Sequence, residues 1–149
     1  MNQNNRKRIL VVEVVCVLFI LLFAYASVTK MLDFEQFRTE LRRSPLLTFF
    51  ATWVAIGIPM LEVILSIFLT IERFRLASIY CAYGLMVIFS AYIVAITKFA
   101  DYIPCSCGGV LSSMNWKQHL VFNCAFIAFA LIAIFIYPSK ESLTFENTP

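Results

Sequence analysis

Charged residues are nearly absent from four long windows of the chain. Two of these windows each hold one acidic residue, Glu13 and Glu62, and the other two hold no charge at all. A bilayer core about 30 Å thick requires about 20 apolar residues of α-helix, at about 1.5 Å per residue. The pattern therefore predicts four transmembrane helices, at about residues 9–29, 46–71, 76–97 and 119–137.

The composition excludes an ordinary soluble domain. Hydrophobic residues make up 61% of the 149 residues and charged residues only 14%, whereas soluble domains are about one quarter charged. A soluble bundle of buried helices would need polar helix faces, which these windows lack. The net charge of +3 and the absence of a basic face with aromatic residues give no sign of nucleic-acid binding. We expect one all-α domain over residues 1–149, an integral membrane four-helix bundle.

The first window has a second interpretation. The stretch RKRILVVEVVCVLFILLFAYAS has a basic start, an apolar run and small residues at its end, as a signal peptide has. However, the apolar run is long and contains Glu13, and cleavage would leave three helices. We therefore expect the segment to be retained.

The orientation in the membrane follows from the basic cluster Arg6-Lys7-Arg8, which abuts the first window. The first helix usually sets orientation, with positive charge on the cytoplasmic side. We expect a multi-pass protein of the bacterial inner membrane with both termini in the cytoplasm. Residues 30–44 and 98–119 then lie outside, and residues 72–75 lie inside.

The first outer segment, KMLDFEQFRTELRRSPLL, has a helical period. Met31, Phe34, Phe37 and Leu41 are spaced by three, three and four residues, which places them on one helix face. Such a helix would lie on the membrane or cap the bundle. Ser44-Pro45 would end it. We expect a surface helix without chemistry of its own.

The second outer segment contains PCSCGG, with Cys105 and Cys107 one residue apart. Cysteines on the oxidising side of a membrane are candidates for redox chemistry. A disulfide across one intervening residue closes a tight ring, and strain makes a disulfide easier to reduce. The spacing thus favours a bond that exchanges over a bond that only holds the loop.

Other interpretations of the Cys-Ser-Cys loop stay open. The pair could bind Cu(I) with His119 as a third ligand, whereas zinc would want wider spacing and a second pair. The pair could be structural, or one member could bond to Cys124. Cys16 and Cys81, like Cys124, lie within predicted helices, where cysteine is usually a small buried apolar residue.

Polar residues near and within the windows suggest a built site. Trp116, His119 and Asn123 are spaced by three and four residues and share one helix face near the outer surface. His119 could stabilise a thiolate or move a proton, although an interfacial histidine is usually just solvated. The amide of Asn123 within a span needs a partner, usually on another helix. Glu62 must be neutral, paired or in contact with a ligand such as a quinone headgroup, and Lys30 is not obviously at its depth.

These motifs together resemble the MauE branch of the DoxX-like membrane proteins. CSCGG followed by Trp116 and Asn123 is similar to that family's pattern around its cysteine pair. AYASVTKMLDFEQF and IPMLEVIL are similar to the end of its first span and to its second span. The likeness runs in order from about Ala24 to Tyr137. Gly108 stands where many relatives have an aromatic residue.

The resemblance implies a four-helix membrane bundle in which Cys105 and Cys107 are the redox pair. Lys30, Glu62, Trp116 and Asn123 match residues of the family pattern. MauE is implicated in maturing methylamine dehydrogenase, whose small subunit is rich in disulfides, and DoxX relatives accompany sulfur oxidation with quinone.

We therefore expect a membrane thiol–disulfide redox protein, with thiol–disulfide oxidoreductase as its candidate activity, that exchanges electrons with a thioredoxin-like or other exported thiol protein. The electrons could pass to a quinone or through the helix cysteines, of which the quinone is the simpler route. The alternative is a non-catalytic membrane subunit that positions a redox partner, alone or as an oligomer. A copper-binding membrane protein is a further alternative.

Overall fold

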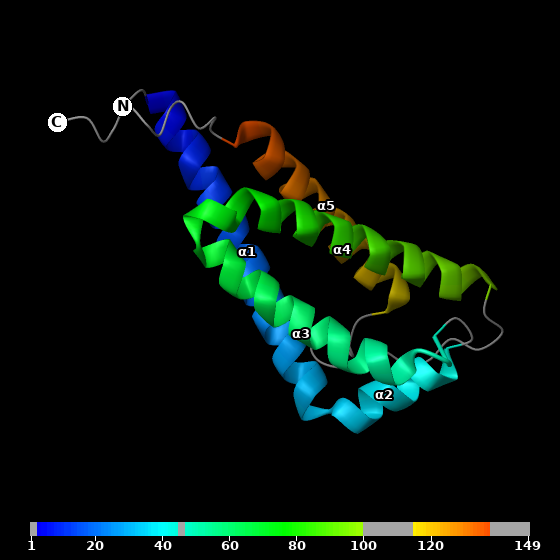
Figure 1. The fold of residues 1–149 in the computed structure, drawn as a ribbon. Helices are drawn as coiled ribbons and strands as arrows, with labels where there is room; N and C mark the ends of the chain where they lie inside the picture. The colour runs from blue at the N-terminus through cyan, green and yellow to red at the C-terminus, as the bar shows by residue number, and fades with distance from the viewer. Residues whose placement is uncertain (1–2, 45–46, 100–114, 138–149) are drawn as a thin grey trace.

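The computed structural model describes residues 3–44, 47–99 and 115–137. Within these ranges every regular element is an α-helix, which confirms the predicted all-α class (Figure 1). The helices in chain order are α1 (Gln3–Leu32), α2 (Phe34–Arg43), α3 (Ala51–Thr70), α4 (Glu72–Phe99) and α5 (Trp116–Ile136).

Four of these helices, α1, α3, α4 and α5, are long and apolar enough to cross a membrane. This finding confirms the four predicted spans, although their bounds differ from the predicted windows. α1 and α4 extend past their windows at both ends, α3 lies within its window, and α5 begins three residues earlier than predicted. Residues 72–75 were predicted to be a loop, but they form the first turn of α4. Charged residues are readily accommodated at a helix end. The connection from α3 to α4 is reduced to Ile71, whose N–H donates to the carbonyl of Phe68 at 3.2 Å.

The long helices form two pairs. α1 packs mainly on α3, and α4 packs mainly on α5. A shared core holds the pairs together, in which the ring of Phe19 on α1 meets the ring of Phe126 on α5 edge to face, at 5.2 Å between centroids. Many large apolar side chains point outward, among them Leu21 and Phe135. An outer surface of this kind fits a hydrocarbon environment.

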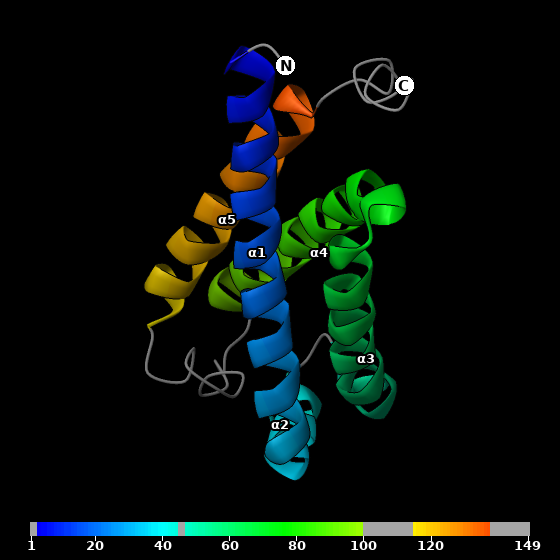
Figure 2. The same ribbon diagram turned by 90° about the vertical axis from the view of Figure 1, so that its left-hand side faces the viewer.

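The two ends of the bundle differ. The start of α1, the α3–α4 junction and the end of α5 lie together at one end (Figure 1). The end of α1, all of α2 and the start of α3 lie toward the other end, as do the end of α4 and the start of α5. The two helix pairs diverge toward this second end (Figure 2).

The short helix α2 is the amphipathic helix that the sequence predicts. Phe37 and Leu41 are buried and pack with Ala51 and Ala55 of α3. The inclusion of Met31 on this face was wrong, because α1 continues to Leu32 and the chain turns only at Asp33. The side chain of Met31 consequently belongs to α1 and is exposed.

Candidate functional site: a buried ion pair and an aromatic cavity

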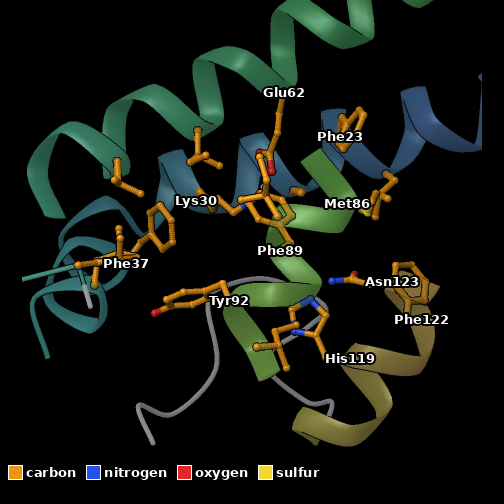
Figure 3. A pocket seen from close by; sticks show the side chains of 18 of the residues that line it. Phe23, Lys30, Phe37, Glu62, Met86, Phe89, Tyr92, His119, Phe122 and Asn123 are labelled. Carbon is orange, nitrogen blue, oxygen red and sulfur yellow. Dashed lines mark hydrogen bonds and ion pairs between the residues drawn. The ribbon is translucent and has the colours of Figure 1, made fainter. Parts of the chain in front are cut away.

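A cavity of about 260 Å³ lies between the helix pairs at the α2 end of the bundle. All five helices contribute to its wall, and Figure 3 shows their side chains. Most of the lining is aliphatic or aromatic. The polar side chains in it include Lys30, Glu62, His119 and Asn123. A mostly apolar cavity with a few convergent polar groups is typical of a ligand-binding site.

The strongest polar contact in the cavity is an ion pair between α1 and α3. The ammonium of Lys30 donates a hydrogen bond to Glu62 Oε1 at 2.5 Å. Lys30 is 7% exposed and Glu62 is 1% exposed. The second carboxylate oxygen of Glu62, Oε2, is buried and has no hydrogen-bond partner among the described residues. The pair therefore satisfies only one of the two oxygens.

Two aromatic rings enclose the ammonium of Lys30. Its Nζ atom lies 5.9 Å from the ring centroid of Phe37 on α2 and 5.7 Å from that of Phe89 on α4. A cation within about 6 Å of an aromatic ring is attracted by the ring's negative face. Lys30 thus connects α1 to α2, α3 and α4. The predicted surface helix α2 turns out to form part of the wall of the cavity.

The first turns of α5 supply the opposite wall. α5 begins after Asn115, whose backbone N–H donates to the side-chain Oε1 of Gln118 at 3.0 Å, as in a capping box. This start places Trp116, His119 and Asn123 on the cavity side of the helix. The rings of Trp116 and His119 stack with 6.5 Å between centroids. The shared face predicted from their spacing is therefore present.

Asn123 lies deepest of these three side chains. It is 2% exposed, and its Nδ2 atom is buried without a hydrogen-bond partner among the described residues. In Figure 3 its side chain extends from α5 toward α4, while Glu62 reaches into the cavity from α3. An unpaired donor and an unpaired acceptor thus line the same space. Buried polar groups are nearly always hydrogen-bonded, so a pair of this kind is unusual.

Five of the seven predicted site residues lie around this one cavity, namely Lys30, Glu62, Trp116, His119 and Asn123. The expectation that Lys30 would not reach the depth of Glu62 was wrong. α1 continues for two residues beyond Lys30 and lies against α3, and this packing brings the two side chains together. Sequence reasoning missed Phe89 and Tyr92, because α4 is apolar throughout its span and offers no period to mark its inner face.

Cys105 and Cys107 lie outside the described residues. The two helix ends that flank them in the chain, Phe99 of α4 and Trp116 of α5, both belong to the cavity end of the bundle (Figure 1). The other three cysteines are free thiols, and none of them forms a disulfide within the described residues. The described part of the chain contains no group of three side chains that could hold a metal ion.

Comparison with known proteins matches most of the chain to a family model. The family model described as "Methylamine utilisation protein MauE" matches residues 8–136, which include all four long apolar helices except the first residues of α1. Neither a search of curated proteins nor a search of solved structures gave a match. Because the family model covers most of the chain, this multi-pass membrane protein belongs to the MauE family.

Proposed function

We propose that the chain is a membrane thiol–disulfide redox protein that acts through Cys105 and Cys107 on exported proteins. The observation that supports this proposal is the convergence of Lys30, Glu62, Trp116, His119 and Asn123 at one end of the bundle. The helix ends on either side of the cysteine segment belong to that same end. The chain belongs to the MauE family, and we further propose that its role is in the maturation of an extracytoplasmic protein.

The proposed reaction oxidises a dithiol in the partner. A partner thiolate attacks one sulfur of the Cys105–Cys107 disulfide and forms a mixed disulfide, which releases the other cysteine as a thiolate. The other thiolate of the same partner then attacks the partner's sulfur in the mixed disulfide. The partner gains a disulfide and loses two electrons and two protons, while Cys105 and Cys107 become thiols. A thioredoxin-like protein or another exported thiol protein is the proposed partner.

The cysteine spacing and the charges near the site favour electron transfer from the partner to the Cys105–Cys107 disulfide. A disulfide across one residue is strained, so its reduction relieves strain and the pair tends to oxidise others. Cations flank the cysteine segment at this end of the bundle, with Lys98 in the last turn of α4 and Lys117 in the first turn of α5, and a nearby cation stabilises a departing thiolate. Under the proposed orientation this end faces the periplasm, and both termini face the cytoplasm.

The test traps the mixed disulfide. Cys105→Ser and Cys107→Ser are made separately, and membranes are alkylated at once and separated under non-reducing conditions. One variant should accumulate a covalent complex with an exported protein, which reductant releases and mass spectrometry identifies. The double variant is the control and should give no complex. If neither single variant forms a reductant-sensitive complex and the double variant still supports maturation of the partner, the chain acts instead as a non-catalytic subunit.

A further inference from the structure

Two buried polar atoms in the cavity lack partners among the described residues, Asn123 Nδ2 and Glu62 Oε2. They differ in chemistry, since an amide nitrogen only donates hydrogen bonds and a carboxylate oxygen accepts them. They come from different helix pairs, α5 and α3, and both residues line the cavity. A ligand that satisfied both would need an acceptor for Asn123 and, at least in one of its states, a donor for Glu62.

The cavity wall favours a flat ring between these groups. Aromatic side chains from four helices line it, including Phe37, Phe89, Tyr92, Trp116 and Phe122. Flat rings pack well in offset or edge-on contact with such side chains. An apolar cavity of about 150 Å³ is enough for benzene, so about 260 Å³ accommodates a six-membered ring with small substituents. The space is too small for a whole membrane lipid.

One apolar residue of the cavity wall also faces the outside of the bundle. Ile88 on α4 lines the cavity and is 63% exposed. It lies within α4, a helix long and apolar enough to cross a membrane. A ligand ring inside the cavity could therefore carry a long apolar tail that leaves beside Ile88 into the bilayer. A phospholipid headgroup fits less well, because its phosphate would meet the Glu62 carboxylate.

We propose that this cavity binds the ring of a membrane-soluble quinone, with its tail in the bilayer. In the oxidised form, the carbonyl oxygens accept hydrogen bonds from Asn123 Nδ2 and from the Lys30 ammonium, which has donors beyond the one given to Glu62. In the reduced form, a hydroxyl group donates to Glu62 Oε2. The same three side chains thus suit both redox forms.

Binding does not depend on the cysteines, but a role in electron transfer rests on the proposed function. A bound quinone would take two electrons and two protons from the thiols of Cys105 and Cys107. The thiols would become a disulfide and the quinone a quinol. This step would restore the oxidised pair after each partner has been oxidised.

The chain offers a direct optical test, because it has two tryptophans. Trp53 is 78% exposed on α3 and does not line the cavity, whereas Trp116 does. A Trp53→Phe variant therefore leaves one reporter at the cavity. The purified full-length variant in lipid nanodiscs is titrated with a benzoquinone that carries a ten-carbon tail. We expect saturable quenching of Trp116 fluorescence.

Three further variants, each made in the Trp53→Phe background, test whether the quenching reports binding in the cavity. Asn123→Leu removes the donor with little change in volume and should weaken binding about tenfold, as expected for one lost buried hydrogen bond. Cys124→Ala, at the adjacent exposed position, is the matched control and should bind as before. Ile88→Phe narrows the opening without touching the polar groups and should also weaken binding, which covers the case that Asn123→Leu fails to fold.

The ligand class is tested by competition. Methyl decanoate has an ester carbonyl and an apolar tail but no ring, and we expect it to leave the quenching unchanged at equal concentration. Equal binding by the Ile88→Phe, Asn123→Leu and control variants, or equal competition by the ester, would overturn the proposal. A variant with both Cys105→Ser and Cys107→Ser should still bind quinone. If it does and no mixed disulfide is ever trapped, the redox function fails while the quinone site stands.

Discussion

Lys30 near the end of α1 and Glu62 in the middle of α3 form a buried ion pair, although 32 residues separate them in the chain. The pair crosses the interface between the two helices and points into the cavity. Taking both charges out of water is costly, and the contact between them, together with the two aromatic rings beside Lys30, offsets that cost. The pair therefore links the packing of α1 on α3 to the polarity of the cavity.

Replacing one residue of this ion pair should destabilise the protein more than replacing both. Lys30→Met or Glu62→Leu alone should lower the free energy of unfolding by about 3 kcal/mol or more, because the remaining charge is buried without a partner. The double variant should recover most of the loss. The free energy of unfolding of the two single variants and the double variant is measured in mixed micelles with increasing dodecyl sulfate.

The exposed pair of Arg38 and Glu35 on α2 provides the matched control for the buried pair. Its closest atoms are 2.9 Å apart, but the Glu35 side chain is largely exposed. Glu35→Gln should change stability by about 0.5 kcal/mol or less. Additive losses in the Lys30 and Glu62 variants would show that the two buried groups do not stabilise each other.

The cap at the start of α5 should hold Trp116 and His119 at the cavity. Gln118→Ala removes the side chain that accepts a hydrogen bond from the N–H of Asn115 and should cost about 1 kcal/mol. Hydrogen exchange in the first turn of α5 should become faster, while exchange in α3 stays the same. Gln118→Glu keeps the acceptor and should behave like the parent protein. Lys117→Ala, an exposed change in the same turn, should leave hydrogen exchange unaltered. If exchange in the first turn of α5 became as fast in Lys117→Ala as in Gln118→Ala, the result would argue against the cap.

The proposed orientation can be read from two single cysteines placed at opposite ends of the bundle. In a variant without native cysteines, Thr39→Cys introduces a thiol on α2, and Glu72→Cys introduces one at the start of α4; both positions are exposed. A membrane-impermeant maleimide added to intact cells should label the first and not the second, since positive residues before α1 favour a cytoplasmic N-terminus. The opposite pattern would place the cavity end in the cytoplasm.

The three cysteines within helices should be dispensable for exchange. Cys81 and Cys124 are exposed on the outer surface of the bundle, and Cys16 is buried in its core. A variant that carries Cys16→Ala, Cys81→Ala and Cys124→Ala should still trap the mixed disulfide when Cys105 or Cys107 is changed to serine. Loss of trapping in a variant that is still folded and inserted would instead support a relay of electrons through the helix cysteines.

Hydropathy and helical period predicted much of this fold. Long apolar windows must become helices in a membrane, because only a helix satisfies its own backbone there. The period of Phe34, Phe37 and Leu41 likewise identified α2. Helix ends were less well predicted, because hydropathy marks where charge begins and not where the helix stops. Glu72 and Lys98 are charged, yet both lie within α4.

Most residues of the candidate site were predicted from the sequence, but the contacts between distant ones were not. Trp116, His119 and Asn123 share a face by spacing alone, and a lone carboxylate at Glu62 indicated a buried role. The contact between Lys30 and Glu62 depends on how α1 packs against α3, which no local pattern encodes. Phe89 lies in a span where every side chain is apolar or small, so its place beside Lys30 appears only in three dimensions. The redox roles of Cys105 and Cys107 stay predictions.

The most direct test of the redox function is the oxidation state of Cys105 and Cys107 in intact cells. An impermeant maleimide is added before and after mild reductant, and the labelled cysteines are mapped by mass spectrometry. We expect the pair to be oxidised, to be labelled from outside only after reduction, and to become oxidised again when reductant is removed. A pair that stays as free thiols in air, or that reductant never opens, would contradict a thiol–disulfide exchange function.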